Sequence, residues 1–600
     1  MSGSVTRRLC TTPLTDLCRG RLSSALDVEV ALDDDLPAPL RDLVLRVVGR
    51  TRLWRNEKVD VARELASHLQ EGLDAGRTSE DLVTSFGDVA LASKLIRRAK
   101  RRARPPLVRA FVCARNGVLA ILGLCLASYL LLSARYAIAS PTVAHDYVAE
   151  LTAPIRAVPE ADRAWSVYLE ALRAIPPFRI DGVLETPAYA AHGEPGHEAW
   201  VAYHATTTDA LALARKAAAM PSLGYIPSVE PEPALAAIRR ARGDEVAPMG
   251  TVTDYDIPTI AIRFAHLPEL RRLARHLASD AELAAVEGDG GRVVENIRAI
   301  LGIATQLREV PSLISELSSM SVASLALDTT MHVMAVAPDA LSRAQARDLS
   351  HAMAAFAGGS FVLRYDGERI MFDDVLQHVY TDDGAGSGTV ADIALLRSLG
   401  SGRPSMLLDV ATPVLPVVVE DRASARLTYE RILASAEAAR AQPMWERDLT
   451  EHDRLVEQLE ASKWRHIVVS TMAPVFRRLI MQPDLFEQQR DATLCAIALE
   501  LHRRDTVAYP ASLDELTPGL LPTVPVDVHT GQPLCYRIEN GRPLLYSRGI
   551  DRDDDGGTPP AGGVSGAMQW MEPDHLQAQF SSAHGRRLHD GDWILWSPGR

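Results

Sequence analysis

The sequence contains few aromatic residues, few cysteines and hardly any lysine. Aromatic residues make up 5% of the 600 residues. Alanine is abundant, so we expect helix-rich packing rather than a β-sandwich. The six cysteines include no Cys-x-x-Cys pair, which argues against a zinc site and against a disulfide scaffold. The excess of arginine over lysine is typical of a biased genomic base composition and indicates no mechanism.

Catalytic motifs are also missing. The sequence has no G-x-S-x-G elbow, no S-x-x-K and no Walker sequence. Apolar residues at 47% and charged residues at 24% are typical of a folded chain. This balance excludes a wholly disordered, a collagen-like or a polytopic membrane protein. The length predicts several domains.

One long apolar run divides the chain. Residues Gly117 to Ala134 carry no charge, and weakly polar flanks extend the run to residues 111–139. Eighteen uncharged residues reach the threshold for a membrane-spanning helix. A buried core helix is the alternative, but such a helix would be shorter or amphipathic. A cleaved signal peptide does not fit, because the run begins more than a hundred residues into the chain.

The charge distribution predicts an orientation. Residues 1–116 carry a net charge of +6 and the remainder carries −19. Positive residues are retained on the cytoplasmic side, so we expect the N-terminus inside and residues from about 140 onward outside, in a periplasm. A basic collar precedes the span, at Lys94, Arg97, Arg98, Lys100, Arg101, Arg102, Arg104, Arg109 and Arg115. Its place beside the span favours anionic lipid over nucleic acid as its partner.

The segment before the span predicts a small helical domain over residues 36–104, after a poorly ordered stretch at 1–35. Apolar spacing predicts helices over 36–48 and 56–75, a short helix from Thr78 and a basic helix over 89–102. The string ELASHLQEGLDAGRTSEDLVTSFGDVALASKLIRR, Glu64 to Arg98, resembles the HAAS or permease-prefix domain. This resemblance implies a signalling or interaction module without an active site.

Residues 141–490 are expected to form a helical extracytoplasmic domain. Helices are predicted over 162–175, 198–219, 267–286, 292–307, 313–335, 344–356, 422–441 and 444–462. The Gly-Asp turn between 286 and 292 makes an αα-hairpin similar to one tetratricopeptide-type repeat. Residues 396–420 are expected to form an irregular connection.

Two groups of side chains in this domain are candidate sites. Acids at Asp366, Glu368, Asp373, Asp374, Asp382 and Asp383 are the basis for an envelope hydrolase as an alternative function. A solvated face and loop is the simpler expectation for them. His192, His197 and His204 lie near Glu194 and Glu198, but their spacing is not that of a zinc helix. Surface histidines are therefore expected.

The last hundred residues carry a second resemblance. The stretch Ala498 to Gly557 resembles the C-terminal part of type II secretion pseudopilins. The correspondence lies at Tyr509, Pro510, Ser512, Leu513, Leu516, Leu521, Pro522, Pro525, Asp527, Gly531, Pro533, Tyr536, Tyr546, Ser547, Gly549 and Asp551. The closing Asp590-Gly591-Asp592-Trp593 is similar to the acidic-Trp ending of that family. The span lies some 360 residues earlier and lacks the family's processing motif, which makes assembly into a pilus doubtful.

The residues themselves predict a hairpin in this module at 491–600. Residues 534–538 and 543–547 alternate around Asn540-Gly541, which is a hairpin signal. Asp551, Asp553 and Asp555 alternate as in the first half of an EF-hand, although position twelve is Gly562 rather than Glu. Pseudopilins bind Ca²⁺ near this loop, so the resemblance implies Ca²⁺ at these three aspartates. A solvated acidic turn is the alternative.

The sequence therefore predicts a mainly α protein with a single transmembrane helix, a large helical extracytoplasmic region and a small α+β pseudopilin-like module. We expect it to bind another envelope protein as a scaffold, without catalysis. A secretion-system component is a further alternative. Cys495 and Cys535 lie on the outer side, either paired or as buried free thiols.

Overall fold

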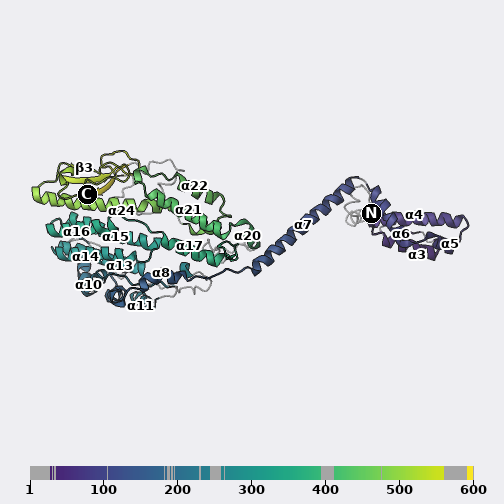
Figure 1. Ribbon diagram of the computed structural model, residues 1–600, viewed down its shortest axis with the longest axis horizontal. Coiled ribbons are helices and arrows are strands. Elements are labelled where there is room, and N and C mark those ends of the chain that lie inside the picture. The colour runs from purple at the N-terminus through teal and green to yellow at the C-terminus, as the bar shows by residue number, and fades with distance from the viewer. Residues whose placement is uncertain are drawn as a thin grey trace. The chain divides into compact units, whose positions relative to one another are not determined.

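The computed structural model is mainly helical (Figure 1). It describes residues 28–29, 31–32, 36–104, 106–180, 183–184, 190, 194, 196–228, 232–243, 258–262, 264–392, 411–473, 476–559 and 591–598. Most of the expected poorly ordered N-terminus, His192, Asp590, Gly562 and most of the expected connection at 396–420 lie outside these residues. The chain divides into two compact units, residues 1–131 and 132–600.

The first unit contains the expected helical domain. Its helices are α3 (Ala38–Arg50), α4 (Arg55–Asp74), α5 (Ser79–Phe86) and α6 (Val89–Ala103). Leu40, Val44, Val47 and Val61 are almost fully buried in its core. Thr78 caps α5 through the N–H of Asp81, and Asp88 caps α6 through the N–H of Ala90. The predicted helix starts are thus confirmed.

The apolar run forms helix α7 (Pro106–Ile138). Its section Cys113–Ile138 is long and apolar enough to cross a membrane, and its side chains are exposed. Leu122, Leu124 and Leu131 are 58%, 69% and 71% exposed. Burying each large apolar side chain is worth about 1.5–3 kcal/mol.

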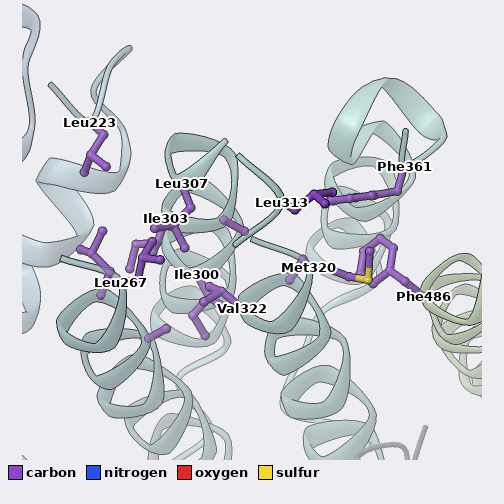
Figure 2. Close-up of a cluster of buried hydrophobic side chains, with 14 of the residues drawn as sticks. Leu223, Leu267, Ile300, Ile303, Leu307, Leu313, Met320, Val322, Phe361 and Phe486 are labelled. Carbon is purple, nitrogen blue, oxygen red and sulfur yellow. The ribbon is translucent and has the colours of Figure 1, made fainter. Parts of the chain in front are cut away.

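The second unit is built around antiparallel helix pairs. α13 (His266–Val286) and α14 (Gly290–Leu307) form the predicted αα-hairpin, and α15 (Leu313–Val336) packs against both. Figure 2 shows Leu267, Ile300, Ile303 and Leu307 converging between these helices. Gly302 lets α14 approach α10, because a Cβ there would lie 2.4 Å from the Ala218 carbonyl oxygen. Small residues therefore set the spacing of this bundle.

Further helices extend the bundle on both sides (Figure 1). Before α13 come α8 (Tyr147–Arg156), η1 (Glu160–Asp162), α9 (Trp165–Ala174), β1 (Arg179–Ile180), β2 (Val183–Leu184), α10 (His197–Ala218), α11 (Pro233–Arg242) and α12 (Pro258–Ala261). After α15 come α16 (Arg343–Ala355), η2 (Phe356–Gly359), α17 (Asp366–Val379), η3 (Thr412–Val414), α20 (Leu415–Val418), α21 (Arg422–Arg440), η4 (Met444–Glu446), α22 (Thr450–Ala461), α23 (Ile467–Met472) and α24 (Phe476–Thr506).

The single helix expected over 444–462 is wrong. The chain turns between η4 and α22 because Arg447 is held in place by several partners. Its guanidinium donates to Asp484 at 2.7 and 3.0 Å and to the carbonyls of Ala439 and Gln442. Asp484 lies 37 residues further along the chain, so local periodicity did not reveal the break.

The C-terminal part packs on α24. The expected boundary at residue 490 falls inside this helix, whose Ala496 and Leu499 share a core with Leu545 and Trp596. After α24 comes the 3₁₀ turn η5 (Leu513–Leu516). Strands β3 (Cys535–Glu539) and β4 (Arg542–Ser547) form the predicted hairpin, with Asn540 and Gly541 at φ of 50° and 78°. A third strand, β5 (Trp593–Trp596), pairs with β4 and was not predicted.

Candidate metal centre

The three predicted aspartates come together in the loop after β4. One carboxylate oxygen from each of Asp551, Asp553 and Asp555 lies within 4.8 Å of the other two, and all three residues are exposed. Hard cations such as Ca²⁺ are bound by carboxylate and carbonyl oxygens. The chemistry of this oxygen set therefore fits Ca²⁺.

Two buried aspartates fix the ends of this loop. Asp527 accepts hydrogen bonds from Ser547 Oγ and from the N–H of Arg548, both at 2.9 Å, where β4 ends. Asp592 accepts one from the N–H of Gly557 at 2.6 Å, beyond the third aspartate. The N–H of Gly591 donates to Asp551 at 3.0 Å. β5 therefore closes the loop and places Asp592 behind it.

Asp592 is the residue that the sequence did not bring into the site. It is fully buried, and its Oδ1 has no hydrogen-bond partner in the described structure. Burial, together with Asp554, Asp555 and Asp551, raises the pKa of Asp592 to about 6, against the Gly557 N–H that lowers it. An orphaned carboxylate oxygen is costly to bury, and a cation would satisfy it. Asp592 is brought to the loop by the pairing of β5 with β4, and sequence patterns did not reveal that pairing.

The loop brings several aspartates close together. Desolvation, then Asp553 and Asp555, raise the pKa of Asp551. Arg548 Nη2 lies 3.8 Å from Asp554. Asp554 is already held by Tyr546 Oη at 3.0 Å. The cluster is therefore arranged so that either a proton or a cation lowers its repulsion.

The two outer cysteines are free thiols in this structure. Cys495 is buried in the core on α24, and burial raises its pKa to about 12. Cys535, on β3, is half-buried and its pKa is also raised by burial. Both thiols are thus kept protonated, which makes them poor nucleophiles and poor metal ligands.

The acidic stretch at 366–383 is the expected solvated face and loop only in part, because Asp366 and Asp383 are exposed whereas Glu368 and Asp374 are buried. Residues 366–379 form α17, and within it Glu368 and Asp374 are buried. Asp374 accepts hydrogen bonds from Thr259 Oγ1 at 2.6 Å and from Gln377 at 2.8 Å. Burial raises the pKa of Asp374, but the bonds from His378, Thr259 and Gln377 outweigh it and lower the pKa overall. Glu368 and Asp374 lie on the face of α17 that packs against elements distant in sequence.

The remaining acids of this stretch are also committed to separate partners. Glu368 accepts from the N–H of Leu313 at 2.9 Å, and Asp373 pairs with Arg426 at 2.7 Å. Asp382 and Asp383 cap the loop that follows α17, accepting from the N–H groups of Gly384 and Ala385 at 2.8 Å. Asp366 is exposed at the start of the helix. These carboxylates stabilise separate parts of the fold and do not converge on one site, as acid/base catalysis would require.

The expectation of surface histidines is wrong for His204. It is 2% exposed on α10, where its Nε2 lies 2.8 Å from Ser279 Oγ and its Nδ1 lies 3.7 Å from Asp280. These are the residue types of a hydrolytic triad. However, Ser279 is buried and its Oγ accepts a hydrogen bond from Trp200 Nε1 at 2.6 Å. Burial lowers the pKa of His204 to about 4, so the group is a core network closed to substrate.

His197 differs from His204. It is half-buried at the start of α10, and its Nδ1 lies 2.8 Å from the carbonyl oxygen of Ala190. Glu194 and Glu198 are exposed. Among the described residues, His197, Glu194 and Glu198 do not form a group that could hold a metal ion.

A cavity of about 460 Å³ opens between α9 and α11. Its described lining is apolar apart from Arg173 and Arg242, and it includes neither a carboxylate nor a nucleophile. Arg242 is engaged by Glu269 at 3.0 Å. The cavity therefore lacks the groups that acid/base or nucleophilic chemistry requires.

His266 provides a prediction about pH. Its ring is fully buried beside Tyr225, with centroids 4.0 Å apart, and neither ring nitrogen has a described hydrogen-bond partner. Burial lowers its pKa from 6.5 to about 3. The unfolded chain therefore binds the proton first, and the free energy of unfolding falls as pH drops from 6.5 toward 3.

We expect His266→Leu to remove this loss. Between pH 7 and pH 5 the wild type should lose about 2 kcal/mol that the variant keeps. Denaturant unfolding of the full chain, followed by tryptophan fluorescence, measures the difference, because Trp165 lies beside the ring. Substitution of the exposed His351 by leucine is the control. Parallel pH dependences for His266→Leu and wild type would contradict the assignment.

No family model, curated protein or solved structure matches this chain.

Proposed function

We propose that the protein is a single-pass envelope protein that holds an interaction domain on the cytoplasmic side and a helical scaffold on the outer side. The observation that carries this proposal is α7, whose exposed apolar section joins two folded units. The opposite net charges on either side of that section support an N-inside orientation. The absence of an open catalytic constellation among the described residues is compatible with a binding role.

The outer region begins directly after the apolar helix. Ala144 and His145 both donate backbone N–H groups to Gln377 at 3.1 Å, six and seven residues beyond the end of α7 at Ile138. Six extended residues span at most about 20 Å. We infer that the last turn of α17 is held close to the membrane surface, so that the scaffold has a defined membrane-proximal end.

A candidate partner surface lies at this end. Arg422, at the start of α21, donates its backbone N–H to Gly388 in the loop that follows α17. Just before it, Glu420 donates its N–H to the carbonyl of Arg465, beside Trp464. Large apolar side chains are exposed around this junction at Val417, Val418, Leu427 and Trp464. Exposed apolar side chains that gather in one region are typical of protein interaction sites.

The two resemblances extend the proposal to particular modules. The pseudopilin-type positions contact one another: Tyr536 Oη donates to the Pro510 carbonyl at 2.9 Å, and Asp527 binds Ser547. Leu513, Leu516 and Leu521 share their core. In the cytoplasmic unit, Gly87 at φ 76° and Asp88 make the corner of the prefix-type pattern. These contacts support a pseudopilin-like end module and a HAAS-like prefix.

Site-specific photocrosslinking in intact cells tests the scaffold role. A photoreactive residue at position 464 is expected to give one discrete adduct with another envelope protein. The same residue at Val507, which is 91% exposed beyond the end of α24, is the control and should give none. Absence of any adduct at positions 464, 427 and 417 would contradict a scaffold that binds through this surface.

A further inference from the structure

The basic helix α6 has one face turned into its own domain. Ser93 is buried there, and its Oγ donates to the Val47 carbonyl on α3 at 3.0 Å. Val89 and Ile96 are half-buried against the same core. These contacts fix which side of α6 faces outward.

The outward face combines leucines with unpaired cations. Leu91 and Leu95, one turn apart, are 57% and 58% exposed. Lys94, Arg98, Arg101 and Arg102 are exposed around them. By contrast, Lys100 pairs with Glu64 at 2.5 Å on a neighbouring helix. The described structure gives the four outward cations no carboxylate partner.

The residue that follows α6 is tied to the start of α4. Arg104 donates two hydrogen bonds to Glu57, at 2.6 and 2.7 Å, and lies over the Trp54 ring at 3.9 Å. Only Arg104 and Pro105 separate α6 from α7. A clamp this close to the span keeps α6 within reach of the membrane surface.

We propose that this outward face lies on the anionic inner leaflet of the membrane that α7 spans, so the inference rests on the proposed span. Leu91 and Leu95 enter the boundary between headgroups and acyl chains, and the four cations contact lipid phosphates. An amphipathic helix with a basic polar face and exposed leucines binds in this way. Nucleic acid would complement the cations but not the leucines. The prefix domain is thereby held flat on the membrane, with α4 and α5 left for a protein partner.

The test uses the full chain in nanodiscs with an environment-sensitive fluorescent amino acid at Ala99, which is exposed on the same helix. Lipids that carry a quencher in the acyl chain report contact. We expect at least twofold stronger quenching in discs with 30% phosphatidylglycerol than in pure phosphatidylcholine. Each basic contact is worth about fivefold in docked population. Arg98→Glu with Arg102→Glu should therefore reduce quenching to the phosphatidylcholine level, and Leu91→Ser with Leu95→Ser should also weaken it.

Two controls separate the possible failures. Arg63→Glu changes an exposed arginine on α4 and should leave quenching at position 99 unchanged. A second probe at Leu124 should be quenched in every disc, and its failure would refute the span itself. A reference probe on α4 gives the quenching expected without docking. If position 124 is strongly quenched but position 99 is quenched no more than this reference probe, the docking of α6 alone is overturned.

Discussion

Replacing Leu122 and Leu126 of α7 by arginine is expected to release the protein from the membrane. Both side chains are nearly 60% exposed and lie near the middle of the apolar section. An arginine at the centre of a membrane helix costs about 2.5–3.5 kcal/mol on insertion scales, so two cost about 5–7 kcal/mol. The full chain should move from the carbonate-resistant pellet to the soluble fraction.

The control places one arginine at an exposed leucine of the second unit. Leu427 is 61% exposed on α21, and Leu427→Arg should leave the protein in the membrane pellet. If the α7 variant stays in the pellet as firmly as wild type, the helix is not the membrane anchor. The two-unit architecture would then need another explanation for an exposed apolar helix.

Calcium is expected to raise the thermal stability of the C-terminal module. A cation that binds the folded state alone stabilises it by about 2.7 kcal/mol at a free concentration one hundred times its Kd. Asp553→Asn with Asp555→Asn should abolish the rise in Tm. A scan of the full chain in detergent, in EGTA and then in millimolar Ca²⁺, measures it. Glu457→Gln with Glu460→Gln removes two exposed charges elsewhere and serves as the control.

The buried Asp592 gives this calcium effect a pH dependence. Its pKa is raised to about 6 in the fold, so the carboxylate is protonated below pH 6 and charged above it. Without metal, the free energy of unfolding therefore falls as pH rises from about 4 to 6. Ca²⁺ should stabilise more at pH 7.5 than at pH 5, and Asp592→Asn should flatten that difference. A Tm that Ca²⁺ leaves unchanged at both pH values would discard the site.

Local signals in the sequence predicted most helices and the hairpin. The α13–α14 pair follows from helical spacing and a Gly-Asp turn, and the Asn540-Gly541 turn follows from its need for positive φ. Ser342 and Gln345 form a capping box at the start of α16. Each of these features depends on residues within one or two turns of one another.

Burial of polar groups was less predictable, because it depends on which distant element covers a face. Asp374 is buried by Thr259, which lies 115 residues earlier, and His204 is buried against Ser279, 75 residues later. Asp592 comes close to the loop of Asp551, Asp553 and Asp555 only through β5, about 40 residues after Asp551. The three loop aspartates were predicted because they are neighbours in sequence, whereas the buried aspartate behind them was not.

Protease access on the two sides of the membrane tests the central claim most directly. A specific protease site inserted at the exposed turn Gly76-Arg77, and another at the exposed loop Gly384-Ala385, leave both units intact. In right-side-out vesicles we expect cleavage at 384–385 and protection at 76–77, with the reverse in inverted vesicles. Cleavage of both sites in the same vesicles would contradict a single span with the N-terminus inside.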